Sequence, residues 1–484
     1  MFIRSQRLLA ILSLLTTFAL DFPTEVVFAV EGKSVLAIAV QNKQWDRLDG
    51  LIEQKIDVNV AQVDGMTALH WAVLHDNGGV VKKLIDSGAD VNAQNRYGVS
   101  VLYLACLNGN GRIVEQLLQK GADAHHELTG GETLLMTAAR TGKVTPVKRL
   151  LDKDVKVNEK DRKGQTAIMW AAAAGNKEVV ELLIEAGADY RTPLKSGFTP
   201  LFFAIREGRT NVVLRLLEEG LDVNQPMQIE RQSGKSPRNG MTPLMLAIEN
   251  GHFELAAKLL ELGADPNEKR TGYTPLHALT WVRKPVRGDG DPSPIGSGEM
   301  GSLDFVRELI KRGADVNARH GKHSAGNQRL NKTDATAFLL ACETGDLPYL
   351  KLLLELDADP SLKNKDNTTP LLAAAGVGIL SNGDESAGTE EEAIATVELL
   401  LKRGADVNAV DDRGHSGMHG AAYKSWTKLV QLLADHGADI EIWNQKNHFK
   451  RTPLEIAQGH RPGNFRPSAE TIAAIERVMQ AVAE

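Results

Sequence analysis

Paired apolar stretches of helical period, separated by glycines, run through most of this 484-residue chain. The pattern is clearest at residues 167–187, where an alanine-rich stretch from Ala167 is interrupted at Gly175. The following stretch, 177–185, carries apolar residues at the spacing of one helix face: Val179, Val180, Leu182, Leu183 and Ile184. Gly187 then stands where a glycine ends a helix in the left-handed conformation. This segment is predicted to be a helix–turn–helix pair.

The glycine that closes this pair recurs every 33 residues through the first half of the chain. The full series is Lys55, Gly88, Gly121, Asp154, Gly187, Gly220, Gly263, Gly313, Asp357, Gly404 and Gly437, and seven members open the tripeptide Gly-Ala-Asp. A fixed period of this length indicates one supersecondary unit stacked many times, which makes a solenoid and not a globular enzyme. Where Lys55, Asp154 and Asp357 replace the glycine, we expect backbone strain of about 1 kcal/mol each.

Threonine and proline mark the helix starts. Thr166 precedes the alanine-rich helix and is expected to be its N-cap, with the hydroxyl accepting a backbone N–H. Proline follows the corresponding threonine in other units, at the first helical position where its missing N–H costs nothing. These prolines are Pro200, Pro243, Pro275, Pro370 and Pro453.

The sequences "TALHWA" at 67–72, "TPLMLA" at 242–247, "TPLHAL" at 274–279 and the recurring "GADVN" resemble the ankyrin repeat. The resemblance covers residues 33–484 in about twelve units, with 33–62 and 448–484 departing from the pattern as capping units. It implies an all-α ankyrin-repeat solenoid, in which each helix–turn–helix unit is followed by a hairpin-like loop at a right angle.

Four segments break the period, and all are rich in residues typical of loops. Segments 225–238 and 318–333 lengthen the connection between units, whereas 282–302 and 376–392 lengthen the turn between the two helices of a unit. Such insertions in repeat proteins commonly mark a binding face. Tolerated neutral insertion is the alternative, above all for the two helix-turn segments.

Residues 1–29 are expected to be a signal peptide, because Arg4 and Arg7 precede an apolar run (8–20) too short to span a bilayer. Small residues before a cut near Ala29 complete the pattern, and an uncleaved anchor is the alternative. No other segment is long and apolar enough to span a membrane. The protein is therefore expected to be periplasmic or secreted. Since ankyrin proteins of eukaryotes are mostly intracellular, the resemblance then points to a bacterium.

Composition and motifs give little support to catalysis or to the binding of nucleic acid, cofactors or metals. With a net charge of −6, nothing global indicates nucleic acid binding. "GSGEMG" at 296–301 lacks the preceding strand that a dinucleotide site needs. His419 shares its repeat position with His70 and His277, which favours a structural role over metal binding. Cys106 and Cys342 lie several repeats apart, too far for a disulfide. We predict no enzyme activity, cofactor or metal.

The resemblance implies a partner surface built from the hairpin tips and the exposed face of the first helices. The positions that carry it here are Arg96, Tyr97, Arg162, Lys163, Lys195, Phe198, Arg206, Arg238, Met241, Arg270, Tyr273, Trp281, Arg413, Tyr423 and Lys424, accompanied by Leu107, Asn108, Glu249 and His415. Aromatic residues and arginine are enriched at interface hot spots. The surface also carries more basic than acidic groups, although Glu132, Glu343, Asp366 and Asp412 dilute the excess.

We therefore predict a monomeric, non-catalytic scaffold that binds a protein or peptide of acidic character in a groove centred on units five to eight. For charge alone, a merely solvated surface is an equal alternative. A secreted effector that engages a host protein and a structural component of the cell envelope are the alternative functions.

Overall fold

The computed structural model of the chain describes residues 34–230, 239–284, 293–321, 330–378, 388–460 and 466–483. Within these ranges the regular elements are helices, and the remaining pairing consists of three isolated β-bridges. The predicted all-α class is confirmed. The chain divides into two compact units, one ending at Asp189 and one beginning at Tyr190, and each is described by itself.

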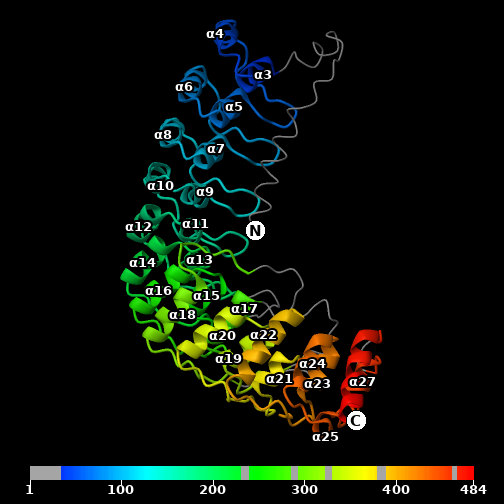
Figure 1. Cartoon of the computed structure of the whole chain (residues 1–484). Helices are drawn as coiled ribbons and strands as arrows, with labels where there is room; N and C mark the ends of the chain where they lie inside the picture. Colours follow the sequence, from blue (N-terminus) through cyan, green and yellow to red (C-terminus); the bar gives the residue numbers. More distant parts are fainter. Residues whose placement is uncertain are drawn as a thin grey trace, which may run out of the picture. The chain divides into compact units, whose positions relative to one another are not determined.

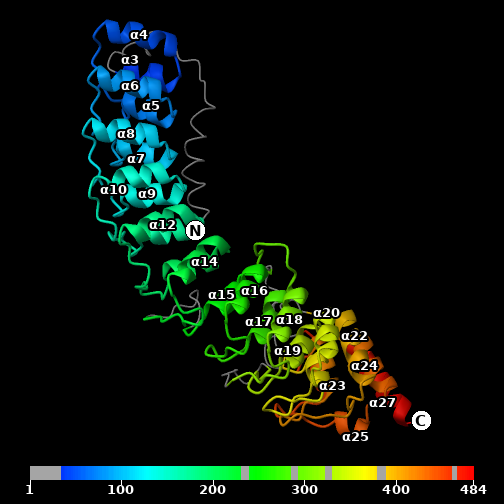
Figure 2. The ribbon, with the colours of Figure 1, turned by 90° about the vertical axis from the view of Figure 1, so that its left-hand side faces the viewer.

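The first unit stacks five helix pairs in two layers. In Figure 1 the first helices of the pairs form one layer and the second helices form the other. Figure 2 shows the second helices lying roughly parallel to one another. The pairs are α3 (Val35–Gln41) and α4 (Trp45–Glu53), α5 (Ala68–Leu74) and α6 (Gly78–Asp86), α7 (Val101–Asn108) and α8 (Gly111–Gln119), α9 (Leu134–Thr141) and α10 (Val144–Leu151), and α11 (Ala167–Ala174) and α12 (Lys177–Glu185).

The second unit continues the same pairing. Its pairs are α13 (Pro200–Arg206) and α14 (Thr210–Glu218), α15 (Pro243–Glu249) and α16 (Phe253–Glu261), α17 (Pro275–Arg283) and α18 (Ser302–Lys311), α19 (Ala337–Thr344) and α20 (Leu347–Glu355), α21 (Pro370–Ala374) and α22 (Glu390–Leu401), α23 (Gly417–Lys424) and α24 (Thr427–Asp435), and α26 (Pro453–Ala457) and α27 (Ala469–Ala483). The short helix α25 (Ile440–Trp443) lies between the last two pairs. Helix enters two of the segments predicted as loops, since α17 reaches Arg283 and α22 starts at Glu390.

The first helices begin as the sequence predicts. Each one from α5 onward is preceded by a threonine or serine in extended conformation, and the five predicted prolines occupy the start of their helices. One expectation is wrong in detail. Thr166 is the N-cap residue of α11, but its hydroxyl is buried without a hydrogen-bond partner in the described part of the chain.

The residues that close the helix pairs adopt left-handed backbone conformations. Gly88 and Gly187 have φ of 92° and 85°. Lys55, Asp154 and Asp357, which replace the glycine, have φ of 57°, 54° and 68°. The expectation that these three residues carry a strained conformation is therefore confirmed.

The asparagine of "GADVN", or its equivalent, links one repeat to the next at most junctions. For example, Asn59 donates from Nδ2 to the Gly88 carbonyl at 3.1 Å and accepts the Asp90 N–H at 2.7 Å. The same two hydrogen bonds recur at Asn92, Asn158, Asn224, Asn267, Asn317 and Asn408. At three junctions the position holds His125, Arg191 or Ser361 instead.

The core lies between the two helix layers and between successive pairs. Cys106 and Cys342 are both fully buried there as free thiols, as predicted. Burial raises the pKa of each thiol, because the thiolate would lose its hydration. No described helix has the length and apolar character needed to cross a membrane. The predicted signal peptide, residues 1–29, lies outside the described residues.

Candidate interaction surface

The hairpin tip before α7 is held in shape by one side chain and one glycine. In the hairpin before α7, the Asn95 carboxamide oxygen accepts the backbone N–H groups of Tyr97 and Val99, each at 3.0 Å. The Asn95 N–H donates to the Val99 carbonyl at 3.0 Å, and Gly98 has a φ of 74°. The tip is thus closed by local bonds, which leaves the Tyr97 side chain to project outward.

Neighbouring tips are joined through their backbones. The Arg96 N–H donates to the Asp64 carbonyl at 2.9 Å, and the Arg162 N–H donates to the Gly130 carbonyl at 3.1 Å. The approach is so close that a Cβ on Gly65 would lie 2.8 Å from the Arg96 nitrogen. These contacts join the tip of Asp64 to that of Arg96 and the tip of Gly130 to that of Arg162.

Five exposed side chains stand on these tips in the first compact unit, and we call them the tip row: Val63, Arg96, Tyr97, Arg162 and Lys163. Val63 and Tyr97 are 82% and 69% exposed, far above other large apolar side chains of this unit. Four members of the tip row are predicted by the sequence. Val63 is not, although it lies one 33-residue period before Arg96, and this register would have identified it.

The first-helix face beside the tip row adds further contact groups. Leu107 on α7 is 40% exposed, as predicted. The Arg140 guanidinium lies 5.1 Å from the ring centroid of Trp170, a pair that the sequence analysis missed because each belongs to a different repeat. Asn108 instead has a structural role, since its Nδ2 donates to the Val73 carbonyl at 2.7 Å.

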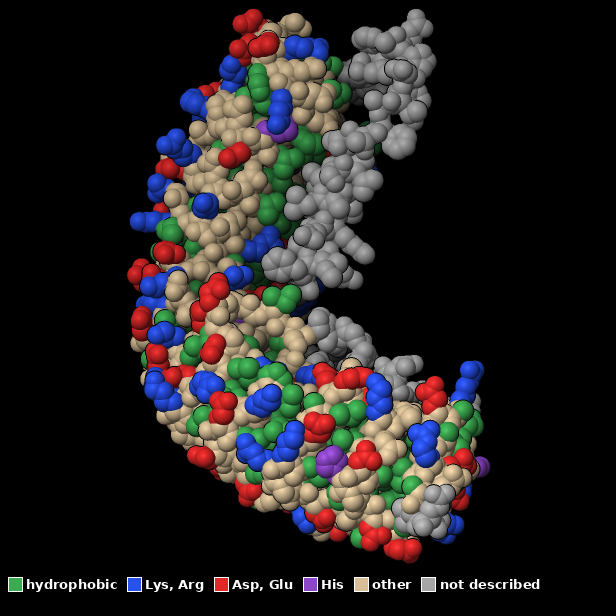
Figure 3. Space-filling view, in the orientation of Figure 1, with side chains coloured by type: hydrophobic (Ala, Val, Ile, Leu, Met, Phe, Trp, Pro, Cys, Tyr) green, Lys and Arg blue, Asp and Glu red, His purple; other side chains and the backbone are tan. Residues whose placement is uncertain are grey.

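The second-helix side of the same unit is different in chemistry. In Figure 3 its edge is crowded with lysine, arginine, aspartate and glutamate side chains. Several of them pair with one another, such as Arg149 with Glu115 at 3.1 Å and Lys83 with Asp49. Mutually paired surface charges of this kind are typical of a solvated face.

In the second unit, three residues predicted for the partner surface are buried. Phe198, Met241 and Tyr273 are 6%, 0% and 1% exposed. Each directly precedes the N-cap of a first helix, and a residue there packs onto the helix as a hydrophobic staple. The Phe198 ring, for example, lies 5.0 Å from the ring of Phe203. The expectation that these side chains form an exposed cluster is wrong.

Trp281, the predicted centre of the groove, is only half-buried but is already covered on two sides. Its ring packs edge-on against Tyr273 at 4.8 Å, and the Lys332 ammonium lies 5.5 Å from the ring centroid. Glu249 accepts a 2.5 Å hydrogen bond from the Tyr273 hydroxyl. These side chains pack against and hydrogen-bond to one another, so they leave less accessible surface for a partner than the tip row does.

The predicted cations of the second unit vary in their surroundings. Lys195 and Arg270 are exposed, and Arg270 pairs with Glu268 at 2.8 Å. Arg206 is half-buried over the rings of Phe198 and Phe203. Arg238 lies outside the described residues.

Tyr423 and Lys424, also predicted as exposed, are 3% and 8% exposed. Lys424 packs closely against a glycine of another repeat, since a Cβ on Gly376 would lie 2.7 Å from Lys424 Cγ. The Tyr423 hydroxyl accepts a hydrogen bond from Asn447 Nδ2 at 3.0 Å. Burial lowers the pKa of Lys424 to about 8, although Glu343 opposes this effect. The ammonium lies 4.7 Å from the centroid of the Trp426 ring.

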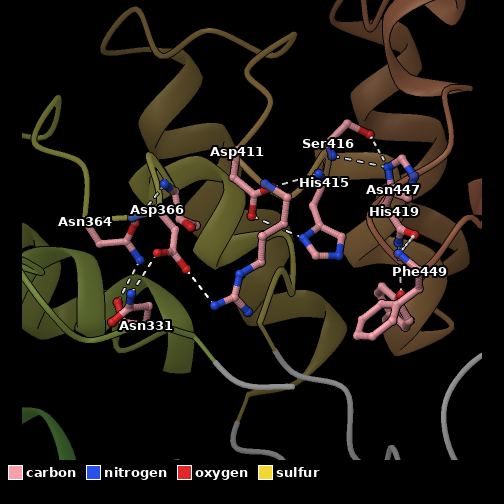
Figure 4. A network of polar contacts seen from close by, with 12 residues as sticks. Asn331, Asn364, Asp366, Asp411, His415, Ser416, His419, Asn447 and Phe449 are labelled. Carbon is pink, nitrogen blue, oxygen red and sulfur yellow. Dashed lines mark hydrogen bonds and ion pairs between the residues drawn. The ribbon is translucent and has the colours of Figure 1, made fainter. Parts of the chain in front are cut away.

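The hairpin tips of the later repeats are tied together by side chains (Figure 4). Asn364 donates to the Asn331 carbonyl at 2.7 Å, and Asn331 donates to Asp366 at 2.7 Å. Asp366 also pairs with Arg413 at 2.8 Å, which leaves the Arg413 side chain 26% exposed. Arg413, a predicted contact residue, is therefore part of an internal network.

The histidines of the repeats are structural, as predicted. His70, His277 and His419 each bond through Nδ1 to the N-cap residue and through Nε2 to a backbone carbonyl of the following hairpin. Burial lowers the pKa of His277 to about 3 and that of His419 to about 4. His415 is buried as well, with Nδ1 bonded to Asp411 at 3.2 Å, so its predicted exposure is wrong.

The glycine-rich segment 296–301 is held against the start of α16. In "GSGEMG" the Ser297 N–H donates to Nδ1 of His252 at 2.9 Å, and the Glu299 N–H donates to Glu254 at 2.7 Å. The segment thus folds back onto the turn before α16. Across the described ranges, no group of three or more metal-binding side chains comes together.

Comparison with known proteins places the repeats in a family. The model described as "Ankyrin repeats (3 copies)" matches residues 8–95, 102–193, 135–227, 227–283 and 387–465, which together exceed half of the chain. "Ankyrin repeats (many copies)" matches 79–118, and "Ankyrin repeat" matches 271–321.

Individual relatives are similar over part of their length. The chain is 30% identical over 184 residues to the mouse B-cell lymphoma 3 protein homolog, covering 33% of this chain and 38% of that protein. It is 29% identical over 226 residues to human ankyrin repeat and SOCS box protein 16, covering 37% and 49%. It is 26% identical over 146 residues to an ankyrin repeat protein of Rickettsia bellii, covering 30% and 36%. The matched region is thus less than half of each of these relatives. The chain belongs to the ankyrin-repeat family, whose repeats generally mediate protein–protein interaction and are typically non-catalytic.

Proposed function

We propose that this protein is a binding scaffold that engages a protein or peptide partner through the tip row and the adjoining first-helix face of residues 34–189. The observation that carries the proposal is the exposure of Tyr97 and Val63, 69% and 82%, on tips that are otherwise fixed by backbone bonds. A large side chain held on a rigid support loses little conformational freedom on binding, which favours affinity.

The charge of the tip row favours a partner of acidic character. Its exposed charged members are Arg96, Arg162 and Lys163, all cations. The carboxylates at these tips are turned inward, since Asp64 accepts the Met66 N–H at 2.9 Å and Asp161 accepts the Lys163 N–H at 2.8 Å. An acidic segment that also carries an apolar side chain would match both properties of the surface.

Site-specific photo-crosslinking tests the location of the surface. A benzophenone amino acid is placed at Tyr97 or Lys163 and, as the matched control, at exposed Lys148 on α10. After irradiation in the native extract, we expect one discrete adduct from both tip positions and none from the control. Adducts from Lys148 alone, or none from either tip position, would contradict the proposal.

We also propose that the protein acts as a monomer and is exported. Support for export comes from the charged and apolar pattern of residues 1–29, which is typical of a signal peptide. Cell fractionation with N-terminal sequencing of the mature chain tests it, and a cytoplasmic chain that retains residues 1–29 would refute it. Ultracentrifugation of the purified chain tests the monomer. The compartment of the crosslinked partner then distinguishes the two alternative functions. A host protein as partner favours a secreted effector, and an envelope protein favours a structural component of the envelope.

A further inference from the structure

Three junctions between repeats lack the asparagine bridge, and the first of them lies between two junctions, those of Asn92 and Asn158, that have it. At seven junctions an asparagine donates to a carbonyl and accepts an N–H two residues later, both in the next turn. Between the α7–α8 pair and the α9–α10 pair, the asparagine position is His125. Its side chain is exposed and forms no hydrogen bond to the next turn within the described ranges.

The groups that an asparagine would bridge are both present. Asn59 bonds to the carbonyl of Gly88 and the N–H of Asp90. At the junction of His125 the equivalent groups are the carbonyl of Asp154 and the backbone N–H of Lys156. Neither has a hydrogen-bond partner among the residues that the structure describes. The junction therefore offers one acceptor and one donor at the spacing that a carboxamide fills elsewhere in this chain.

A cavity of about 110 Å³ opens at this place. Its lining includes His125, Lys156, Thr133, Leu135 and Val155. The charged side chains of the lining are two carboxylates, Glu127 and Glu159, and one ammonium, Lys156, which pairs with Glu159 at 2.9 Å. The one carboxylate in excess disfavours an anionic ligand.

We propose that this junction binds a primary carboxamide, namely the side chain of an asparagine or glutamine supplied by a partner polypeptide. A carboxylate has no N–H to donate to the Asp154 carbonyl, and an ammonium group has no acceptor for the Lys156 N–H. A primary carboxamide supplies both in one planar group. The proposal is independent of the tip row, because it rests on the turn that follows α10 and not on a hairpin tip.

Nuclear magnetic resonance of the full chain tests the site directly. Labelling valine with ¹³C at the carbonyl and lysine with ¹⁵N selects amides of lysines that follow valine, which are Lys82, Lys148 and Lys156. The first two lie inside α6 and α10 and serve as internal controls. Propionamide is the probe, and propionate and N,N-dimethylpropionamide, which lack the N–H donor, are the control compounds.

Two variants separate binding from non-specific effects. His125→Ala leaves the junction open, whereas His125→Asn supplies the missing carboxamide from the chain itself. We expect propionamide to shift the Lys156 amide downfield, in a saturable manner, in the wild type and in H125A but not in H125N. The two control amides and the two control compounds should give no such shift. A shift that persists in H125N, one shared by Lys82 and Lys148, or no shift at all would overturn the proposal.

Discussion

Removing one inter-repeat amide bridge should weaken one junction and leave the others intact. Asn92→Ala deletes the 3.1 Å bond to the Gly121 carbonyl and the 2.8 Å bond from the Asp123 N–H. A typical intramolecular hydrogen bond contributes about 0.5–1.5 kcal/mol, and both bonds are solvent-exposed, so the two together stabilise the junction by about 1–2 kcal/mol. In a solenoid this loss stays with the nearest-neighbour interface.

Hydrogen exchange followed by mass spectrometry measures this effect locally. A loss of about 1.4 kcal/mol in local opening corresponds to a roughly tenfold faster exchange of the Asp123 amide. The Asp189 amide, which bonds to Asn158 at 2.7 Å in an equivalent junction, is the internal control and should not change. Unchanged exchange at Asp123, or equal acceleration at Asp189, would refute the reasoning.

The other predictions concern pH, glycine and thiols. Since burial lowers the pKa of His277 to about 3, its folded form stays neutral while the unfolded form takes up a proton below about pH 6.5. The free energy of unfolding should therefore fall as pH decreases from about 6.5 towards 3, by up to about 1.4 kcal/mol per pH unit. Urea denaturation should show a shallower pH dependence for His277→Leu, and an equal slope in both chains would contradict this. Gly65→Ala should destabilise the fold more than Gly88→Ala in the same assay, because both have positive φ but only Gly65 faces backbone within 3 Å; equal losses would show that the close approach is unimportant. Cys106 and Cys342 should stay unreactive toward Ellman's reagent until the protein is unfolded, and rapid labelling of the native chain would disprove their burial.

The parts of the fold set by local interactions could be predicted from the sequence. The helix starts at Pro243 and Pro275 and the left-handed residues at Lys55 and Asp154 depend on backbone preferences of a few neighbouring residues. The repeat period then places these local units in order. Such features need no knowledge of the tertiary contacts.

Exposure could not be predicted in the same way, because it depends on how neighbouring hairpins and helices pack. Phe198 and Tyr273 lie only a few residues after a hairpin tip, yet the position before the N-cap turns them onto the helix. Lys424 is buried because Gly376, in another repeat, leaves room for its stem. Val63 is exposed at a position where other repeats carry Arg96 and Arg162. Because valine is usually buried, its residue type did not indicate a surface position.

The affinity of the crosslinked partner, once purified, for variants of the tip row tests the central claim most directly. The variant Arg96→Ala, Tyr97→Ala, Arg162→Ala and Lys163→Ala is compared with Lys148→Ala, which removes a cation from the second-helix side. We predict a loss of at least about 2 kcal/mol for the tip variant, roughly a thirtyfold weaker dissociation constant, and an unchanged value for Lys148→Ala. Full affinity in the folded tip variant would contradict the account.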